Sequence, residues 1–327
     1  MPDLIEKNQK FEKQLIIVPG YFKSGSTLMY RYVWPKLGYT MLPKRHAQSD
    51  VGLFKRRLAG LILKIKQSKS SLNVGSGRRI DFELTQTAKQ TDEIVSLIQM
   101  IFKLSQSNKV VAELGFLRPG LNDEILKRLH KPFQLLRSEG IDIKFFFYVR
   151  EQSELILSRA KHDFRSFPPY LANPPSLTID STNLKAIFSE YNVCRCIYPF
   201  CISSTVDNSK NDCVGDCGLL GKKVYEWKFY DFTFQVKRFK QLTGITDVYV
   251  QPLNYLIMQP QDALKRLASW LDTKMQVDIK VFPKINSSPD SQDNIKMSKQ
   301  ARELIFKKYE GSNKELCQIF NLPSESF

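Results

Sequence analysis

The chain has 327 residues, 42% of them hydrophobic, which excludes a disordered chain and is enough for one large α/β domain or two modest ones. Its 49 basic and 33 acidic side chains give a formal charge of +16, which favours anionic ligands without identifying one. We expect a cytoplasmic protein, because segment 1–13 is polar and no apolar run approaches the roughly 20 residues of a bilayer span. We expect no nucleic-acid partner, because the sequence has no zinc-finger or RNA-recognition motif.

Apolar strand patterns alternate with helical patterns through the first half of the chain. Buried strands are predicted over residues 14–18, 109–113 and 141–149. Helices are predicted between and around them, over 26–37, 92–104 and 125–138. This alternation predicts an α/β fold of the P-loop-like, three-layer kind, with a mostly parallel central sheet flanked by helices.

The composition changes after Arg165, where four prolines precede a stretch that holds five of the six cysteines. We interpret residues 165–223 as an insertion over the sheet, a lid or substrate-binding segment within a single domain spanning residues 1–327. Regular patterns then resume. They predict a helix over 232–242, a strand over 247–251, a helix over 261–271 and two tail helices over 298–309 and 313–320.

A loop of small residues joins the first predicted strand to its helix and reads Gly20-Tyr-Phe-Lys-Ser-Gly-Ser-Thr27. Such a loop directs backbone N–H groups from the positive end of a helix dipole, which suits a phosphate group. The nucleotide-triphosphate loop G-x-x-x-x-G-K-[ST] has its lysine after the last glycine, whereas Lys23 precedes Gly25 by two residues. Lys23 can therefore reach past a phosphate held by residues 24–27, towards the group leaving from it. A turn that binds nothing is the alternative.

A second candidate phosphate contact follows the strand over 141–149. Arg150 comes directly after that strand, and Ser158 stands eight residues later, two helical turns along. The arginine's bidentate fork and the serine hydroxyl can converge on one phosphate. An arginine and a serine at this spacing are common, so the pair alone does not indicate a phosphate site. It does so only together with the loop that precedes it in the chain.

Together the two elements resemble the sulfotransferases that use 3′-phosphoadenosine-5′-phosphosulfate (PAPS). Segment 22–27, FKSGST, is similar to that family's 5′-phosphosulfate loop, commonly written PKSGTT, with Phe22 in place of the proline and Ser26 in place of the first threonine. Arg150 with Ser158 resembles the family's 3′-phosphate element.

The resemblance continues more faintly along the chain. Segment 250–256 and the helix after it look like a further family stretch, although Asn254 stands where a glutamate is usual. The run 146–152, FFYVREQ, is closest in style to bacterial members that act on glycans.

This resemblance implies transfer of a sulfuryl group from PAPS to an acceptor hydroxyl or amine, with adenosine 3′,5′-bisphosphate as product and no metal requirement. The acceptor would be a glycan or glycolipid, or alternatively a small metabolite. The implied cofactor contacts are Lys23, Ser24, Gly25, Ser26, Thr27, Arg150 and Ser158, with Lys222 and Lys223 approaching the 3′-phosphate as the family's basic loop does.

Three residues are candidates for the catalytic chemistry. Lys23 would stabilise the leaving phosphate oxygen. Glu113 ends a strand, so it should project at the carboxyl edge of the sheet, where open α/β sheets bind ligands, and it is the leading candidate for the base. A cap of the turn before Gly115 is the alternative for this glutamate. His162 lies four residues after Ser158 on the same helical face and can reach the nucleotide or acceptor.

A simpler surface position is the alternative for each of the three histidines, His46, His130 and His162. His130 lies within Lys127-Arg-Leu-His-Lys131, which we interpret as a basic helix end where the helix dipole explains the charge.

Between Lys44 and Arg79 there are ten basic residues and one acid. Residues 52–66 within it have amphipathic helical spacing. A solvated basic face on a packed helix is one interpretation, and a docking surface for an anionic acceptor or a membrane is the other.

The cysteines are clustered. Cys194, Cys196, Cys201, Cys213 and Cys217 fall within 24 residues, and Cys317 stands apart. In a cytoplasmic protein this clustering favours free thiols or zinc over disulfides, although the spacing is not a standard zinc pattern.

Two other functions fit parts of the pattern. A P-loop kinase or nucleotide hydrolase would also place a strand, loop and helix around phosphate, but the chain lacks the Gly-Lys-Ser/Thr order and a clear magnesium-binding aspartate. A catalytically silent binder of glycans or membranes would keep the fold without the chemistry.

Overall fold

The computed structural model of the chain describes residues 11–19, 26–42, 58, 76–114, 117, 123–165, 177–181, 230–274, 282 and 295–327. Five parallel strands form the central sheet in the order β2-β3-β1-β4-β6. In chain order they are β1 (Lys13–Pro19), β2 (Thr40–Met41), β3 (Lys109–Leu114), β4 (Ile141–Val149) and β6 (Val248–Pro252). Two short strands, β5 (Leu177–Ile179) and β7 (Ile295–Met297), form a separate parallel pair. The predicted α/β fold with a parallel central sheet is confirmed.

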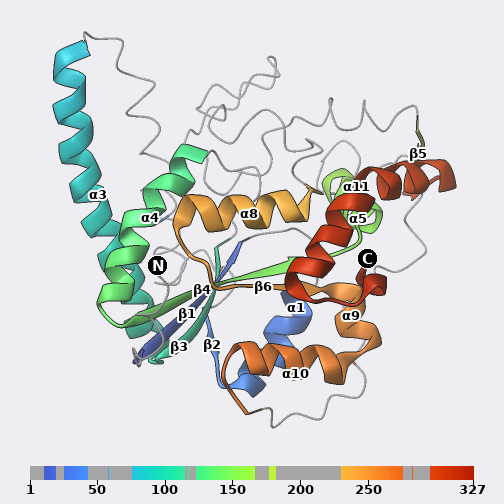
Figure 1. Cartoon of the computed structure of the whole chain (residues 1–327), viewed down its shortest axis with the longest axis horizontal. Coiled ribbons are helices and arrows are strands. Elements are labelled where there is room, and N and C mark those ends of the chain that lie inside the picture. Colours follow the sequence, from blue (N-terminus) through green and yellow to red (C-terminus); the bar gives the residue numbers. More distant parts are fainter. Residues whose placement is uncertain are drawn as a thin grey trace.

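Helices cover both faces of the sheet (Figure 1). One face is covered by α3 (Ser76–Ser105), α4 (Asp123–Ser138), α5 (Gln152–Arg165), α8 (Phe232–Thr243) and α11 (Lys299–Phe320). The other is covered by α1 (Ser26–Leu28), its π-helical and 3₁₀ continuations η2 (Met29–Val33) and η3 (Pro35–Leu37), α9 (Leu253–Met258) and α10 (Pro260–Trp270). A last 3₁₀ turn, η8 (Ser324–Ser326), follows α11.

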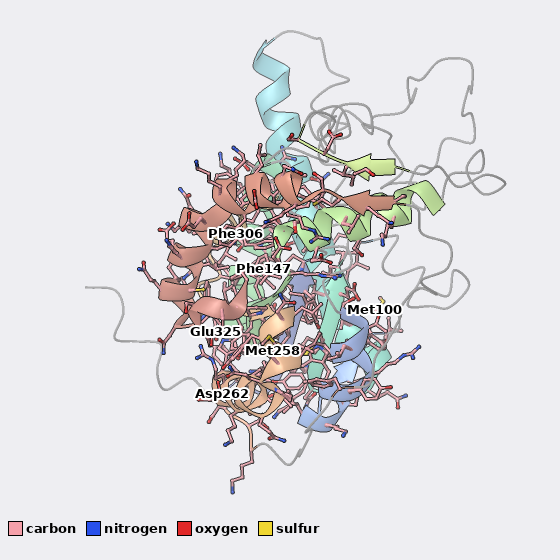
Figure 2. All side chains as sticks on the ribbon, turned by 90° about the vertical axis from the view of Figure 1, so that its right-hand side faces the viewer. Met100, Phe147, Met258, Asp262, Phe306 and Glu325 are labelled. Atoms are coloured by element: carbon pink, nitrogen blue, oxygen red, sulfur yellow. The ribbon has the colours of Figure 1, made fainter. Side chains whose placement is uncertain are left out.

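Alternation along the strands divides the apolar side chains between two cores. In β1, Leu15 and Ile17 face the α3, α4 and α8 side, whereas Ile16 and Val18 face α1 and α10. β4 is apolar on both faces, and Phe147 lies deep inside the molecule (Figure 2). In contrast, Met258 at the end of α9 and Phe306 on α11 are 71% and 51% exposed. Burial on both faces explains the nearly continuous apolar run of β4.

The connections of the sheet diverge at β1 and β4. After β1 the chain passes through α1 to β2, the outermost strand on one side of the sheet. After β4 it passes through α5 towards β6, the outermost strand on the other side. Adjacent strands whose connections diverge leave a crevice beyond their carboxyl ends, and open α/β sheets bind ligands there.

The first helical region differs in kind from the continuous helix predicted over 26–37. It begins as α-helix at Ser26, widens to a π turn closed by the Trp34 N–H to Met29 carbonyl bond of 3.0 Å, and ends as a 3₁₀ turn at Leu37. Pro35 cannot donate a backbone hydrogen bond, so the regular helical ladder ends there.

Other elements also differ from their predicted boundaries. The tail is one helix, α11, where two were predicted, because it continues through Gly311, and open space surrounds that glycine. The helix predicted from residue 92 begins at Ser76. The short strands β2, β5 and β7 were not predicted, since two or three residues are too few for an alternation pattern.

His130 was wrongly placed at a helix end. It lies within α4, which runs on to Ser138, and its imidazole packs against Gly244, the left-handed residue that ends α8. A Cβ added to Gly244 would lie 2.4 Å from Cε1 of His130. The ring is therefore a packing group between two helices.

Two predicted segments lie largely outside the described residues. Of the proposed insertion over 165–223, the structure describes only Arg165 and residues 177–181. Of the amphipathic segment 52–66 it describes Leu58, which is buried in the core that contains α3 and α4. That burial is what a helix packed by its apolar face requires at this position.

Candidate functional site

The predicted phosphate loop begins and ends as the sequence indicates. β1 ends at Pro19 and α1 begins at Ser26, so the intervening residues connect a strand end to a helix entrance. Ser26 and Thr27 are half-buried in the first turn of α1. Lys23, Ser24 and Gly25 lie outside the described residues.

Arg150 stands at the same edge of the sheet. It follows the last residue of β4, and β4 pairs in parallel with β1, from Lys13 opposite Ile141 to Ile17 opposite Phe145. Parallel pairing brings the carboxyl ends of both strands to one edge. The structure therefore brings Ser26, Thr27 and Arg150 to one side of the molecule. Ser158 is half-buried on α5, the helix that begins two residues after Arg150.

Glu154 stands next to Arg150 and was not among the predicted site residues. Its Oε2 accepts a hydrogen bond of 3.2 Å from Arg150 Nη2, and the two side chains are 37% and 26% exposed. Glu154 precedes Ser158 by four residues, so the two share one face of α5. A phosphate at Arg150 would therefore meet a carboxylate already bound there. The four-residue spacing of Arg150 and Glu154 was the available signal in the sequence.

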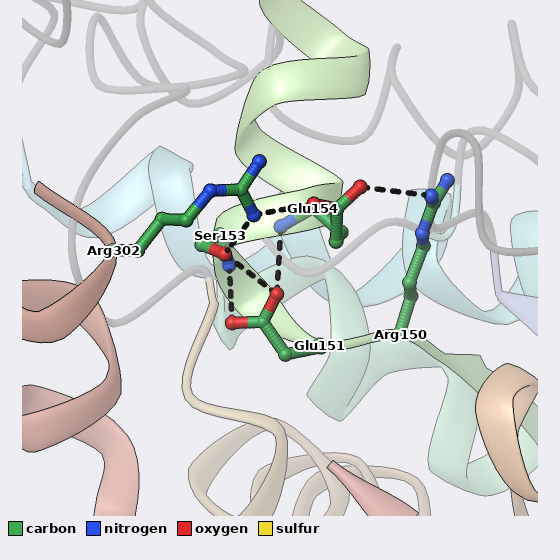
Figure 3. A network of polar contacts seen from close by, with 5 residues as sticks. All are labelled: Arg150, Glu151, Ser153, Glu154 and Arg302. Atoms are coloured by element: carbon green, nitrogen blue, oxygen red, sulfur yellow. Dashed lines mark hydrogen bonds and ion pairs between the residues drawn. The ribbon is translucent and has the colours of Figure 1, made fainter. Parts of the chain in front are cut away.

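Glu151 closes the first turn of α5. Its carboxylate accepts hydrogen bonds from the backbone N–H groups of Ser153 and Glu154, both at 2.9 Å, and from the Ser153 hydroxyl at 2.6 Å (Figure 3). An acidic side chain here satisfies N–H groups that the helix leaves unpaired and opposes the positive end of its dipole. The cap thus defines where α5 starts and how Arg150 leaves β4.

Glu113 occupies the penultimate position of β3, opposite Val18 of β1, and is half-buried. Its side chain belongs to the face that carries Val111, towards α1. Glu113 therefore lies near the carboxyl edge, as predicted, on the side of the sheet where α1 begins.

Tyr148 is a buried hydroxyl near Glu113. Trp34 Nε1 donates to its oxygen at 2.8 Å. Burial raises the pKa of Tyr148 well above its ordinary value, the Trp34 bond opposes that rise, and the negative charge of Glu113 adds to it. The available signal in the sequence was the two-residue spacing of Phe146 and Tyr148, which places both side chains on the same face of β4.

Gln251 is a further buried polar residue beside Tyr148. It pairs with Tyr148 across β4 and β6 and is 1% exposed. Its Nε2 donates to the Pro252 carbonyl at 3.1 Å, while its Oε1 has no partner among the described atoms. An unpaired buried amide oxygen is costly, and an ordered water, an ion or a ligand commonly satisfies such a group.

The remaining candidates are only partly described. The backbone of His162 continues α5, but its side chain lies outside the described residues, as do Lys222, Lys223 and the five clustered cysteines. Cys317 is half-buried, and its thiol donates to the Pro323 carbonyl at 3.5 Å. Within the described ranges no three metal-binding side chains gather closely enough to hold an ion. None of the described helices combines the length and apolarity that a bilayer span requires.

Comparison with known proteins adds little to this geometry. No protein-family model matches the chain, and no curated protein matches its sequence significantly. One similar solved structure is a sulfotransferase from Alicyclobacillus acidocaldarius, with 12% sequence identity, a TM-score of 0.45 and coverage of 94% of this chain and 96% of that one. Chains this distantly alike differ too much in shape for the likeness to assign an activity or a residue role.

Proposed function

We propose that the protein is a PAPS-dependent sulfotransferase. The observation that carries the proposal is the parallel pairing of β1 and β4, adjacent strands with diverging connections, which brings the strand end before the predicted phosphate loop and the strand end before Arg150 to one edge. A nucleotide with phosphates on its 5′ and 3′ oxygens needs two anion sites side by side. A triphosphate places its charges in one chain and needs only the loop.

The donor set fits such a nucleotide. Arg150 donates to a carboxylate oxygen of Glu154 at 3.2 Å, and the same guanidinium could donate to a phosphate oxygen, which supports the proposal. In the proposal the N–H groups of residues 24–27 hold the 5′-phosphate, and Arg150 and Ser158 hold the 3′-phosphate. Lys222 and Lys223 add positive charge to the second site.

The transfer itself needs a base and a cation on opposite sides of the sulfuryl group. As the acceptor oxygen bonds to sulfur, Glu113 takes the acceptor proton. The bond from sulfur to the bridging oxygen of the 5′-phosphate breaks, and Lys23 stabilises the negative charge left on that oxygen. His162 is a second candidate for contact with the acceptor, which we propose to be a glycan or glycolipid. The segment 165–223 would cover the site.

Calorimetric titration of the full chain with adenosine 3′,5′-bisphosphate and with ATP tests the assignment. Tighter binding of the bisphosphate is expected because only that ligand engages both anion sites. Turnover of labelled PAPS with a panel of glycan, glycolipid and metabolite acceptors then tests catalysis. Preference for ATP would favour a kinase or hydrolase, and bisphosphate binding without any sulfate transfer would favour a catalytically silent binder.

A further inference from the structure

Two arginines from distant parts of the chain converge on one carboxylate at the proposed 3′-phosphate site. Arg150 Nη2 lies 3.2 Å from Glu154 Oε2, and Arg302 of α11 binds the other oxygen, Oε1. Arg302 Nη1 also lies 3.1 Å from the Ser153 hydroxyl oxygen. Figure 3 shows Glu154 between the two guanidinium groups. Glu154 is thus the anion of a two-arginine site.

Buried contacts hold α11 where Arg302 reaches this site. The side-chain amides of Gln152 and Asn313 form a reciprocal buried pair of hydrogen bonds, 2.7 and 3.0 Å long, between the start of α5 and α11. At its other end, α11 begins at the Ser298 cap, and the Ser298 N–H donates to the Ile179 carbonyl at 2.8 Å. These contacts place α11, and with it the backbone of Arg302, beside α5 without help from Glu154. The Ser153 hydroxyl gives the Arg302 guanidinium a second contact besides Glu154.

The side chains around the carboxylate are partly exposed. Glu154 and Arg302 are 37% and 39% exposed, and ion pairs exposed to this degree add little stability. A phosphate dianion carries more charge than a carboxylate and offers three oxygens, so it can accept from both guanidinium forks at once. Phosphate should therefore compete well for the two arginines.

We propose that Arg302 is a second 3′-phosphate-binding residue and that Glu154 is an internal anion which occupies both arginines until the phosphate displaces it. This inference rests on the proposed function, because it takes the anion to be the 3′-phosphate of the nucleotide. It predicts opposite effects for the two residues. Loss of Arg302 weakens recognition of the 3′-phosphate, and loss of the Glu154 charge strengthens it.

The test compares adenosine 3′,5′-bisphosphate with adenosine 5′-monophosphate, which lacks only the 3′-phosphate. Arg302→Gln should weaken bisphosphate binding roughly tenfold or more and leave monophosphate binding unchanged, since one charge-assisted contact is lost. Arg302→Lys should fall between, because it keeps the charge without the fork. Glu154→Gln should strengthen bisphosphate binding alone, a gain that misfolding cannot produce.

Lys299→Gln is the matched control. It removes one positive charge from the first turn of the same helix, where Lys299 pairs only weakly with Glu303 at 3.7 Å and is 87% exposed. It should change neither affinity. If the wild-type protein prefers the bisphosphate and Arg302→Gln keeps that preference, the inference is wrong and the proposed function stands. If the wild type shows no preference, the proposed function fails and the inference with it.

Discussion

The two edges of the central sheet handle buried and half-buried charge in opposite ways. At the amino edge, where the strands begin, Lys144 is almost fully buried and two aspartates and an aromatic ring surround its ammonium group. It binds Asp247, lies 3.4 Å from Asp142 Oδ2 and stands 5.3 Å from the centre of the Trp270 ring. Trp270 Nε1 in turn donates to Asp247 Oδ1 at 2.5 Å. Every described polar group of this cluster has a partner within the protein.

At the carboxyl edge the charges are more exposed and the polar groups less completely paired. Glu154 is shared between two arginines, and the Gln251 amide oxygen has no partner among the described atoms. Removing one partner of an enclosed ion pair leaves an uncompensated buried charge, whereas ion pairs that water reaches add little stability and can exchange partners with a ligand. Variants at the amino edge should therefore change stability, and variants at the carboxyl edge should change binding or rate.

Lys23→Ala should give the largest functional effect. If Lys23 is the cation that stabilises the leaving oxygen, as proposed, its removal should lower kcat by roughly 100-fold or more while affinity for adenosine 3′,5′-bisphosphate changes much less. Sulfate transfer from labelled PAPS and calorimetry measure the two quantities separately. Lys36→Ala is the control, since Lys36 is an exposed lysine on η3. An unchanged kcat would remove the assigned role of Lys23.

Lys144→Ala should give the largest effect on stability. It leaves Asp142 and Asp247 without their shared cation and should lower the free energy of unfolding by about 3 kcal/mol, at the low end for a broken buried pair because Asp247 is partly exposed. Urea denaturation measures this change. Nucleotide affinity of the folded variant should equal that of the wild type, and a selective loss of affinity would contradict the division between the edges.

Gly244→Ala and Gly140→Ala separate the stability cost of backbone strain from that of a side-chain clash. Both glycines have positive φ, 73° and 82°, so alanine costs about 1 kcal/mol at each position. Only at Gly244 would the new Cβ collide with the His130 ring, whereas Gly140 has open space. Gly244→Ala should thus be the more destabilising by about 1 kcal/mol or more. Thermal denaturation of the His130→Ala, Gly244→Ala double variant should recover that difference, and no recovery would exclude the clash.

Alkaline pH should give the most gradual effect. Burial raises the pKa of Tyr249 to about 12, against 10.0 for an exposed tyrosine. Between these values the unfolded chain loses a proton that the folded protein keeps, so stability falls as pH rises. Tyr249→Phe should make that fall shallower by about 1.4 kcal/mol per pH unit. Urea titrations at several alkaline pH values measure the slope, and an unchanged slope would contradict the buried position of the hydroxyl.

Local patterns in the sequence were sufficient for most of the elements. The strands β1, β3 and β4 are apolar runs bounded by polar or glycine residues, and β4 was predicted with the bounds that it has, Ile141–Val149. The strand, loop and helix order around Ser26 was equally readable, because a strand signal and a helix signal are each contained within a few residues. The α/β class followed from that order, and the phosphate-binding role of the loop stays a prediction.

Contacts between distant residues were decided only by the tertiary structure. No local pattern places β1 between β3 and β4, joins Glu154 to Arg302 across 148 positions, or sets the His130 ring on Gly244. Those pairings depend on how whole helices and strands pack, and packing energy is shared among many side chains rather than written at one position. The sequence alone therefore determined the α/β class and most of the long elements, and folding decided which charges meet at the carboxyl edge.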